Sequence, residues 1–168
     1  INSTDANGTV AIGYLAGTGI TSGIGNVAMG SEALRTEDTG DYNTAIGHQA
    51  LYTQNRDGTV GNTALGYKAG YAVTDGWENV YIGTNAAVAA TTGFAQVVIG
   101  GNAAPSLTTG DYNIAIGHSA LASEDIGRGT TAIGYKSLYS QNSDSSDEET
   151  KNTAVGYEAG YNLLTSKG

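Results

Sequence analysis

The sequence predicts an all-β fold, a parallel β-solenoid in which short strands stack in successive coils. Two observations carry this prediction: a five-residue motif of the type Asn-Thr-Ala-Ile-Gly recurs along the whole chain, and its copies are almost evenly spaced. Successive closing glycines lie 17 residues apart, except for spacings of 19 and 22 residues before Gly66 and Gly156. Repeats of this length indicate units that bury their apolar side chains by stacking on one another. The closing glycines are Gly13, Gly30, Gly47, Gly66, Gly83, Gly100, Gly117, Gly134 and Gly156, so we expect nine coils in a single domain, residues 1–168.

The three residues before each glycine predict the strand of the coil. The residue just before the glycine is large and aliphatic in every unit, and the residue two places earlier is β-branched, which favours extended backbone. The residue between them is Ala in most units and Tyr81 or Val98 in two. Side chains alternate between the two faces of a strand, so we expect the large residues inside and the alanine column outside. The aliphatic residues predicted to be inside include Ile12, Ile46, Ile82, Ile116 and Ile133.

Two further columns of the repeat predict the ends of the strand. An Asn column four residues before the glycine, which includes Asn43, Asn62 and Asn79, predicts side-chain hydrogen bonds between coils. The closing glycine predicts a corner where φ is positive or another backbone comes close. After the corner we expect a second short strand and then a variable loop.

Composition narrows the range of functions. The chain has 16 acidic and 7 basic residues and no cysteine, so it lacks the basic surface that nucleic acids need and the thiolates that hold many metals. No apolar run approaches the length of a membrane span. His48 and His118 follow closing glycines at positions that elsewhere hold tyrosine, and we expect their rings to stack along the coils. We therefore predict no catalytic residue, no cofactor and no metal site.

Acidic residues gather in the variable loops. The pairs Glu37–Asp38 and Glu124–Asp125 and the segment 143–150 are predicted to be solvated loops. The segment 143–150 has neither the spacing nor the glycine of a calcium loop.

The small coil predicts assembly. About two large aliphatic residues per unit make a marginal core for a single chain. An alanine column on the outside would let chains pack closely. We expect a homotrimer that packs through residues such as Ala45 and Ala115, and that continues end to end as a fibre of which this chain is a segment.

The motifs also resemble a known family. The units at residues 9–13, 26–30 and 43–47 are similar to the head repeats of YadA-type trimeric autotransporter adhesins and to repeat arrays in the tail fibres of bacteriophages. The resemblance implies three left-handed parallel β-rolls side by side, with Val10, Ile12, Val27 and Met29 pointing inward. It also implies an extracellular location, on a cell surface or a virion, and a role in attachment.

A role in attachment requires a ligand, and we expect this ligand to be a glycan on the host surface. The longer loops, residues 52–60 and 139–151, both begin with a Leu-Tyr-x-Gln-Asn sequence, which we expect to present an aromatic ring and two amides at an exposed edge. The candidate ligand-contacting residues are Tyr52, Gln54, Asn55, Tyr139, Gln141, Asn142 and Trp77.

Other functions stay open at this stage. The tyrosines could instead cover the ends of the core or a seam between chains, and the chain could be a purely structural filament without a specific ligand. A polysaccharide-degrading tailspike is a further alternative. An ice- or surface-binding solenoid would need a flat outward Thr face, which is not expected because the Thr residues are predicted to point inward.

Overall fold

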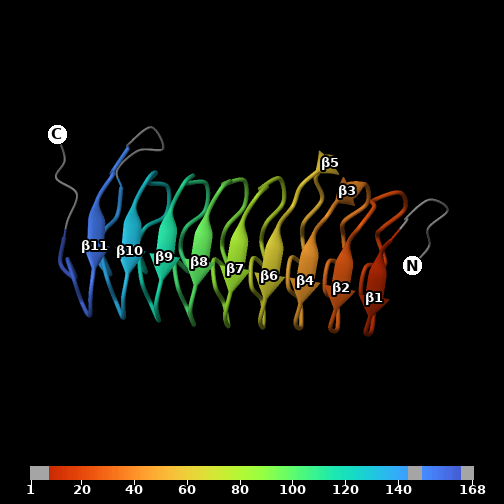
Figure 1. The fold of residues 1–168 in the computed structure, drawn as a ribbon, viewed down its shortest axis with the longest axis horizontal. Coiled ribbons are helices and arrows are strands. Elements are labelled where there is room, and N and C mark those ends of the chain that lie inside the picture. The colour runs from red at the N-terminus through yellow and green to blue at the C-terminus, as the bar shows by residue number, and fades with distance from the viewer. Residues whose placement is uncertain (1–7, 144–148, 164–168) are drawn as a thin grey trace.

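A computed structural model describes residues 8–143 and 149–163, and these residues form a β-solenoid without helices. Short parallel strands follow one another about 17 residues apart and stack along one axis, with β1 and β11 at opposite ends (Figure 1). They form one sheet of nine strands. These strands are β1 (Val10–Ile12), β2 (Val27–Met29), β4 (Thr44–Ile46), β6 (Thr63–Leu65), β7 (Val80–Ile82), β8 (Val97–Ile99), β9 (Ile114–Ile116), β10 (Thr131–Ile133) and β11 (Thr153–Val155).

The register of this sheet keeps equivalent positions of the repeat in columns. Val10 pairs with Val27, and Thr44 pairs with Thr63 across the longer loop that precedes Gly66. The extra residues therefore leave the stack without shifting it. The loops that precede β4 and β6 also pair, because β3 (Gly40–Asp41) and β5 (Gly58–Thr59) form a small parallel sheet at the loop edge. The predicted parallel solenoid is confirmed.

The faces of the strands are the reverse of the prediction. The central residue of each inner strand, such as Ala45, Ala115 or Tyr81, is fully buried, whereas the flanking aliphatic residues are half-buried or exposed. Ile12, Ile46, Ile82, Ile116 and Ile133 therefore lie outside, as do Val10, Val27 and Met29. The physical reason is that the coil is narrow. In most coils the inward position of the strand has room only for the methyl group of an alanine.

Three other columns of the repeat fill the interior. Each coil contributes the alanine (Ser137 in one coil) three residues after the closing glycine, the residue one place later, and the residue seven places after the glycine. These columns supply the large buried side chains, including Leu34, Leu51, Leu121, Ile20 and Leu107. The coil from Tyr67 to Gly83 shows how volumes are matched: a Cβ added at Gly70 would lie 2.6 Å from the ring of Tyr81. The large Tyr81 is thus accommodated by a glycine in its own coil.

The closing glycines form tight corners, as predicted. Gly83 has φ of +129°, and a Cβ placed there would lie 2.6 Å from the carbonyl oxygen of Gly100 in the next coil. Both the backbone angle and the close approach exclude a side chain. The second short strand expected after the corner is wrong, because these residues form turns. Left-handed residues occur two and four places after the glycine, as at Lys136 and Leu138, and they are incompatible with extended backbone.

The asparagine column links the coils through side-chain-to-backbone bonds. Asn79 Oδ1 accepts a hydrogen bond from the backbone N–H of Gln96 at 3.0 Å, and its Nδ2 donates to the carbonyl of Gly93 at 2.9 Å. The same arrangement recurs at Asn62, whose Oδ1 accepts from the N–H of Asn79. These side chains are fully buried. The predicted bonding between coils is confirmed, with backbone N–H groups and carbonyls as the partners.

Two carboxylates expected in solvated loops are instead fully buried. Glu37 Oε1 accepts hydrogen bonds from the backbone N–H groups of Asp38 and Gly40. Glu124 Oε1 accepts from Gly127 at 2.7 Å, and its Oε2 accepts from Nε2 of Gln141 at 3.0 Å. Each carboxylate therefore holds a loop against the interior of the coil. The expectation of solvation is wrong for these two residues.

Candidate functional site

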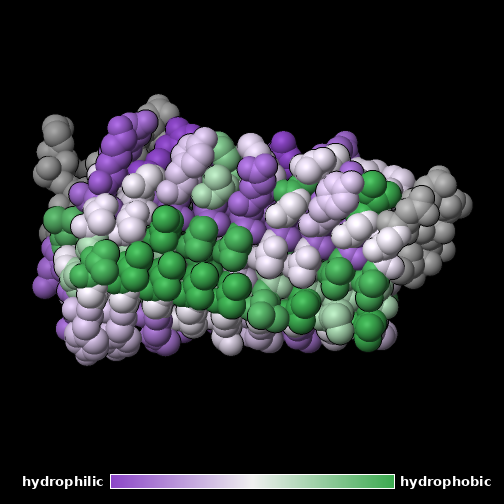
Figure 2. All heavy atoms as spheres, viewed as in Figure 1, coloured by the Kyte–Doolittle hydropathy of each residue, from purple (hydrophilic) through white to green (hydrophobic). Residues whose placement is uncertain are grey.

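The most extensive unusual surface is the outer face of the nine-stranded sheet. We define the outer face as the two residues that flank the centre of each strand. They are aliphatic or Thr in all nine strands, and they include Ile12 and Val155, whose side chains are 56% and 66% exposed. Figure 2 shows a hydrophobic band along the strands. With nine strands at a spacing of about 4.8 Å, the band is roughly 38 Å long.

Threonines also lie on this face, contrary to expectation. Thr44 and Thr63 are neighbours in the sheet, and Thr131 and Thr153 form a second neighbouring pair. Each flanks a strand centre that points inward, so its own side chain lies on the outer face. Val80, Val97 and Ile114 separate the two pairs.

The tyrosines of the predicted loop site stack along the solenoid. Tyr52 lies on Tyr71 with ring centroids 5.1 Å apart, and Tyr139 lies on Tyr161 at 4.9 Å. The guanidinium of Arg35 also lies over the ring of Tyr52. These rings therefore cover one another and present mainly their edges to solvent.

The four amides of the predicted loop site divide into two pairs. Gln54 and Gln141 are fully buried, and their amides bond to Thr74 and Glu124 inside the coil. The expectation that the glutamines lie at an exposed edge is wrong. Asn55 and Asn142 are exposed beside them. Residues 144–148, which hold most of the acidic segment in the second loop, lie outside the described residues.

The histidines lie in similar ladders, as predicted. His48 stacks on Tyr67 at 5.5 Å and His118 on Tyr135 at 5.9 Å. A hydrogen bond with Tyr135 raises the pKa of the neighbouring Lys136 ammonium. Among the described residues no cluster of three or more His, Asp or Glu side chains is placed to hold a metal ion.

Trp77, the last predicted contact residue, starts a row of aromatic rings on three coils. Trp77 stacks on Phe94 at 4.8 Å with an angle of 7° between the ring planes, and Arg56 lies over the indole. The next ring, Tyr112, is turned by 77° relative to Phe94. Tyr112 therefore meets Phe94 edge-on and is 57% exposed.

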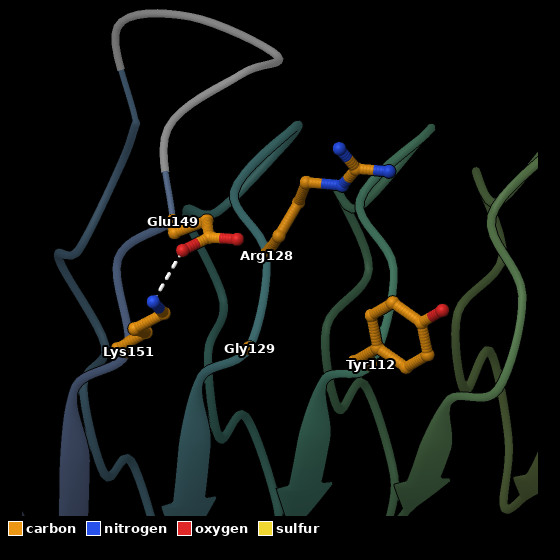
Figure 3. A pocket seen from close by; sticks show the side chains of 5 residues that line it. All are labelled: Tyr112, Arg128, Gly129, Glu149 and Lys151. Atoms are coloured by element: carbon orange, nitrogen blue, oxygen red, sulfur yellow. Dashed lines mark ion pairs between the residues drawn. The ribbon is translucent and has the colours of Figure 1, made fainter.

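A hollow lies beside Tyr112, at a place where no sequence motif predicts one. The hollow has a volume of about 230 Å³ and is lined by Tyr112, Arg128, Gly129, Glu149 and Lys151 (Figure 3). It exists because Gly129 has no side chain to fill the space between Tyr112 on the preceding coil and Lys151 on the following coil.

Opposite charges are balanced around this hollow. Arg128 Nε donates to Asp111 Oδ2 at 3.0 Å, and Arg128 Nη2 contacts the same oxygen. Lys151 Nζ pairs with Glu149 Oε2 and lowers the pKa of that carboxyl group. The hollow thus presents two cations, one carboxylate and one exposed ring, and the buried Asp111 beside it neutralises Arg128.

No family model, curated protein or solved structure matches this chain. No described segment forms a helix long and apolar enough to cross a membrane.

Proposed function

We propose that the chain is a non-enzymatic segment of an extracellular fibre, which assembles as a homotrimer and mediates attachment at a cell or virion surface. The observation that supports this proposal is the exposed outer face. The largest apolar patch on a monomeric protein is typically about 300–600 Å² and often functional, and a band roughly 38 Å by 10 Å reaches this size at about 400 Å².

A second copy of the same chain is the partner that fits this face best. The face carries no charged residue in its nine strands and repeats once per coil, so an identical face offers the same spacing. Three narrow faces can meet around one axis and shield one another, and closed cyclic symmetry is usual for homo-oligomers. The proposed arrangement has nine left-handed coils per chain. The number of coils follows from the nine repeats of the sequence, and the left hand and the three chains side by side are what the resemblance to adhesin heads implies.

The interface therefore involves Val and Ile side chains in place of the alanines predicted from sequence. Ala45 and Ala115 are fully buried within the coil. An Arg at either position is expected to unfold the chain, so it does not test assembly.

Light scattering on outer-face variants tests the proposal. Ile99→Arg places a charge in the middle of the outer face, and Thr92→Arg places the same charge on an exposed loop of the same coil. We expect three chains per particle for the wild type and for Thr92→Arg. For Ile99→Arg we expect single chains with an unchanged circular dichroism spectrum. A wild type that is a folded monomer at micromolar concentration would contradict the proposal.

An ice- or surface-binding solenoid is the second candidate, because Thr44, Thr63, Thr131 and Thr153 lie on the outer face. This function requires the face to be free in solution, so the two candidates exclude each other. A monomeric wild type with measurable thermal hysteresis, lost in Thr63→Lys, would favour it over the fibre.

A further inference from the structure

The hollow at Gly129 interrupts a column of side chains on the loop edge. We name the residues that directly precede the asparagine position the pre-asparagine column. Each of its members has positive φ, and most carry a side chain. The column contains Gly8, Gly25, Tyr42, Gly61, Glu78, Ala95, Tyr112, Gly129 and Lys151.

The glycines of this column differ in what covers them. A Cβ added at Gly25 would lie 2.7 Å from the ring of Tyr42, so that ring already fills the space. A Cβ at Gly129 would meet only Cγ of Lys151, at 3.7 Å. Gly129 therefore leaves a space one coil wide between Tyr112 and Lys151, which lie two coils or roughly 9.6 Å apart along the axis.

The ring of Tyr112 adds a second, independent feature. Trp77 and Phe94 cover each other face to face, whereas Tyr112 meets Phe94 edge-on. Its faces are thus not covered by the aromatic row, and Figure 3 shows the ring beside the open Gly129 with Arg128 and the Glu149–Lys151 pair around the space. An exposed aromatic face next to hydrogen-bonding groups is suited to a molecule with one apolar face and a polar rim.

We propose that this hollow binds one neutral pyranose ring of a surface glycan, with the C–H face of the sugar on Tyr112. The sugar hydroxyls donate to the carboxylate of Glu149 and accept from Lys151 and Arg128. A neutral sugar fits better than an acidic one, because Asp111 and Glu149 balance the two cations and the chain carries a net charge of −9. The inference deepens the proposed role in attachment by naming the ligand class, and it rests on that role for its biological meaning.

Filling the space with a side chain gives a sharp test. Gly129→Tyr is tolerated by precedent, because Tyr42 and Tyr112 occupy the same column with φ of 60° and 58°. Gly61→Tyr is the matched control, since Gly61 lies in the same column with nothing within 4 Å of an added Cβ. Its neighbours in the column are Tyr42 and Glu78, so it lacks the lysine of the hollow.

The probes are the methyl glycosides of glucose, galactose and mannose, with methyl glucuronide for comparison, observed by saturation-transfer difference NMR on the 168-residue chain. We expect millimolar binding of at least one neutral glycoside, with transfer strongest to the C–H protons on one face of its ring. Gly129→Tyr and Tyr112→Leu should weaken binding at least tenfold, and Lys151→Gln about threefold. Gly61→Tyr should bind as the wild type does.

The contrary outcomes separate the sugar site from the fibre proposal. Absence of binding by all three neutral glycosides overturns the site, as does equal binding by Gly129→Tyr or a preference for the glucuronide. Light scattering on the same samples reports assembly. A wild type that assembles without binding sugar contradicts only the sugar site, and one that binds sugar as a monomer contradicts only the trimer.

Discussion

The closing glycines show at single-residue resolution why the repeat tolerates so little change at its corners. Gly83 and Gly156 have nearly the same φ, +129° and +133°, but only Gly83 faces the backbone of a following coil within 3 Å. The nearest atom to a Cβ at Gly156 is Cβ of Ala159, at 3.8 Å. A comparison of substitutions at Gly83 and Gly156 therefore distinguishes the cost of backbone strain from the cost of a steric clash between coils.

We predict that Gly156→Ala lowers the free energy of unfolding by about 1–3 kcal/mol, the usual cost of a strained backbone angle. Gly83→Ala should cost clearly more, because backbone atoms of Gly100 must also move. Chemical denaturation of the two variants measures the difference. Equal losses would show that the approach between coils is not what requires glycine.

Replacement by Gln is expected to change the stability of the protein in opposite directions at Glu37 and Glu124. Burial raises the pKa of Glu37 above its ordinary value of 4.5, although backbone hydrogen bonds oppose the shift. Its Oε2 has no hydrogen-bond partner among the described residues, whereas Oε2 of Glu124 accepts from Gln141. Between the unfolded and folded pKa values the folded chain binds more protons, so stability falls as the pH rises through this interval.

We therefore expect Glu37→Gln to stabilise the protein at pH 7 by about 1 kcal/mol, because it removes the buried charge whose desolvation raises the pKa of Glu37. The gain corresponds to roughly 2–4 °C in Tm. It should vanish well below pH 4.5, where Glu37 is protonated in both states. Glu124→Gln sets two amide N–H groups against each other and should destabilise. Thermal unfolding at pH 3 and pH 7 checks both variants, and a gain for Glu37→Gln that is independent of pH would contradict this explanation.

At the scale of a strand and its ladder, the asparagine column carries more of the stability than its short side chains suggest. Asn79→Ala removes the acceptor for the N–H of Gln96 and the donor to Gly93. Both groups lie in buried surroundings, so we predict a loss of about 2–4 kcal/mol. Asn55→Ala, at an exposed position, should change stability by less than about 0.5 kcal/mol. Urea denaturation gives both values, and similar losses would mean that the column is not a special feature.

The strands also show what the sequence determines and what it leaves open. Spacing alone predicts the strands and the corner at Gly83, because any other register would break the columns. The alternation of large residues with Ala45 or Ala115 fixes two faces but not which one is inside, and a change of one residue exchanges them. Other columns of the repeat determine which face of the strand points inward. Their side chains, such as Leu51 and Leu121, already fill the narrow coil and leave no room for a second row of large residues.

The candidate site was harder to predict for a related reason. Tyr52 and Trp77 were identified as exposed aromatic residues, but the stacking that covers their ring faces depends on which residue lies one coil away. The hollow exists because no side chain covers Gly129. The sequence does not distinguish Gly129 from Gly25, which occupies the same column. Only the structure shows that Tyr42 covers Gly25 and that nothing comparable covers Gly129.

At the scale of the whole molecule, contacts are made almost entirely between successive coils. Each inner strand of the sheet pairs only with the strands before and after it. Stability in such arrays is approximately a sum over units and their interfaces. A complete unit should therefore be removable if every column stays in place.

We predict that deletion of residues 67–83 leaves a folded and shorter solenoid. The deletion joins Gly66 to Thr84, so the corner, the left-handed positions and the strand columns continue in register. It also removes Tyr81 together with Gly70, the glycine that accommodates its ring, and so leaves the volume of the interior matched. Tm should fall by only a few degrees, and small-angle scattering should give a particle about 5 Å shorter.

Deletion of residues 75–83 is the control, because it removes β7 and the corner but keeps the first half of the unit. Thr74 then runs into Thr84 without a closing glycine, and the loop residues are forced into strand columns. We expect this shorter deletion to unfold the protein or to abolish cooperative melting, although it removes fewer residues. If the two deletions were equally harmful, the coils would depend on specific neighbours such as Leu51 with Tyr81, and the columns alone would not specify the fold.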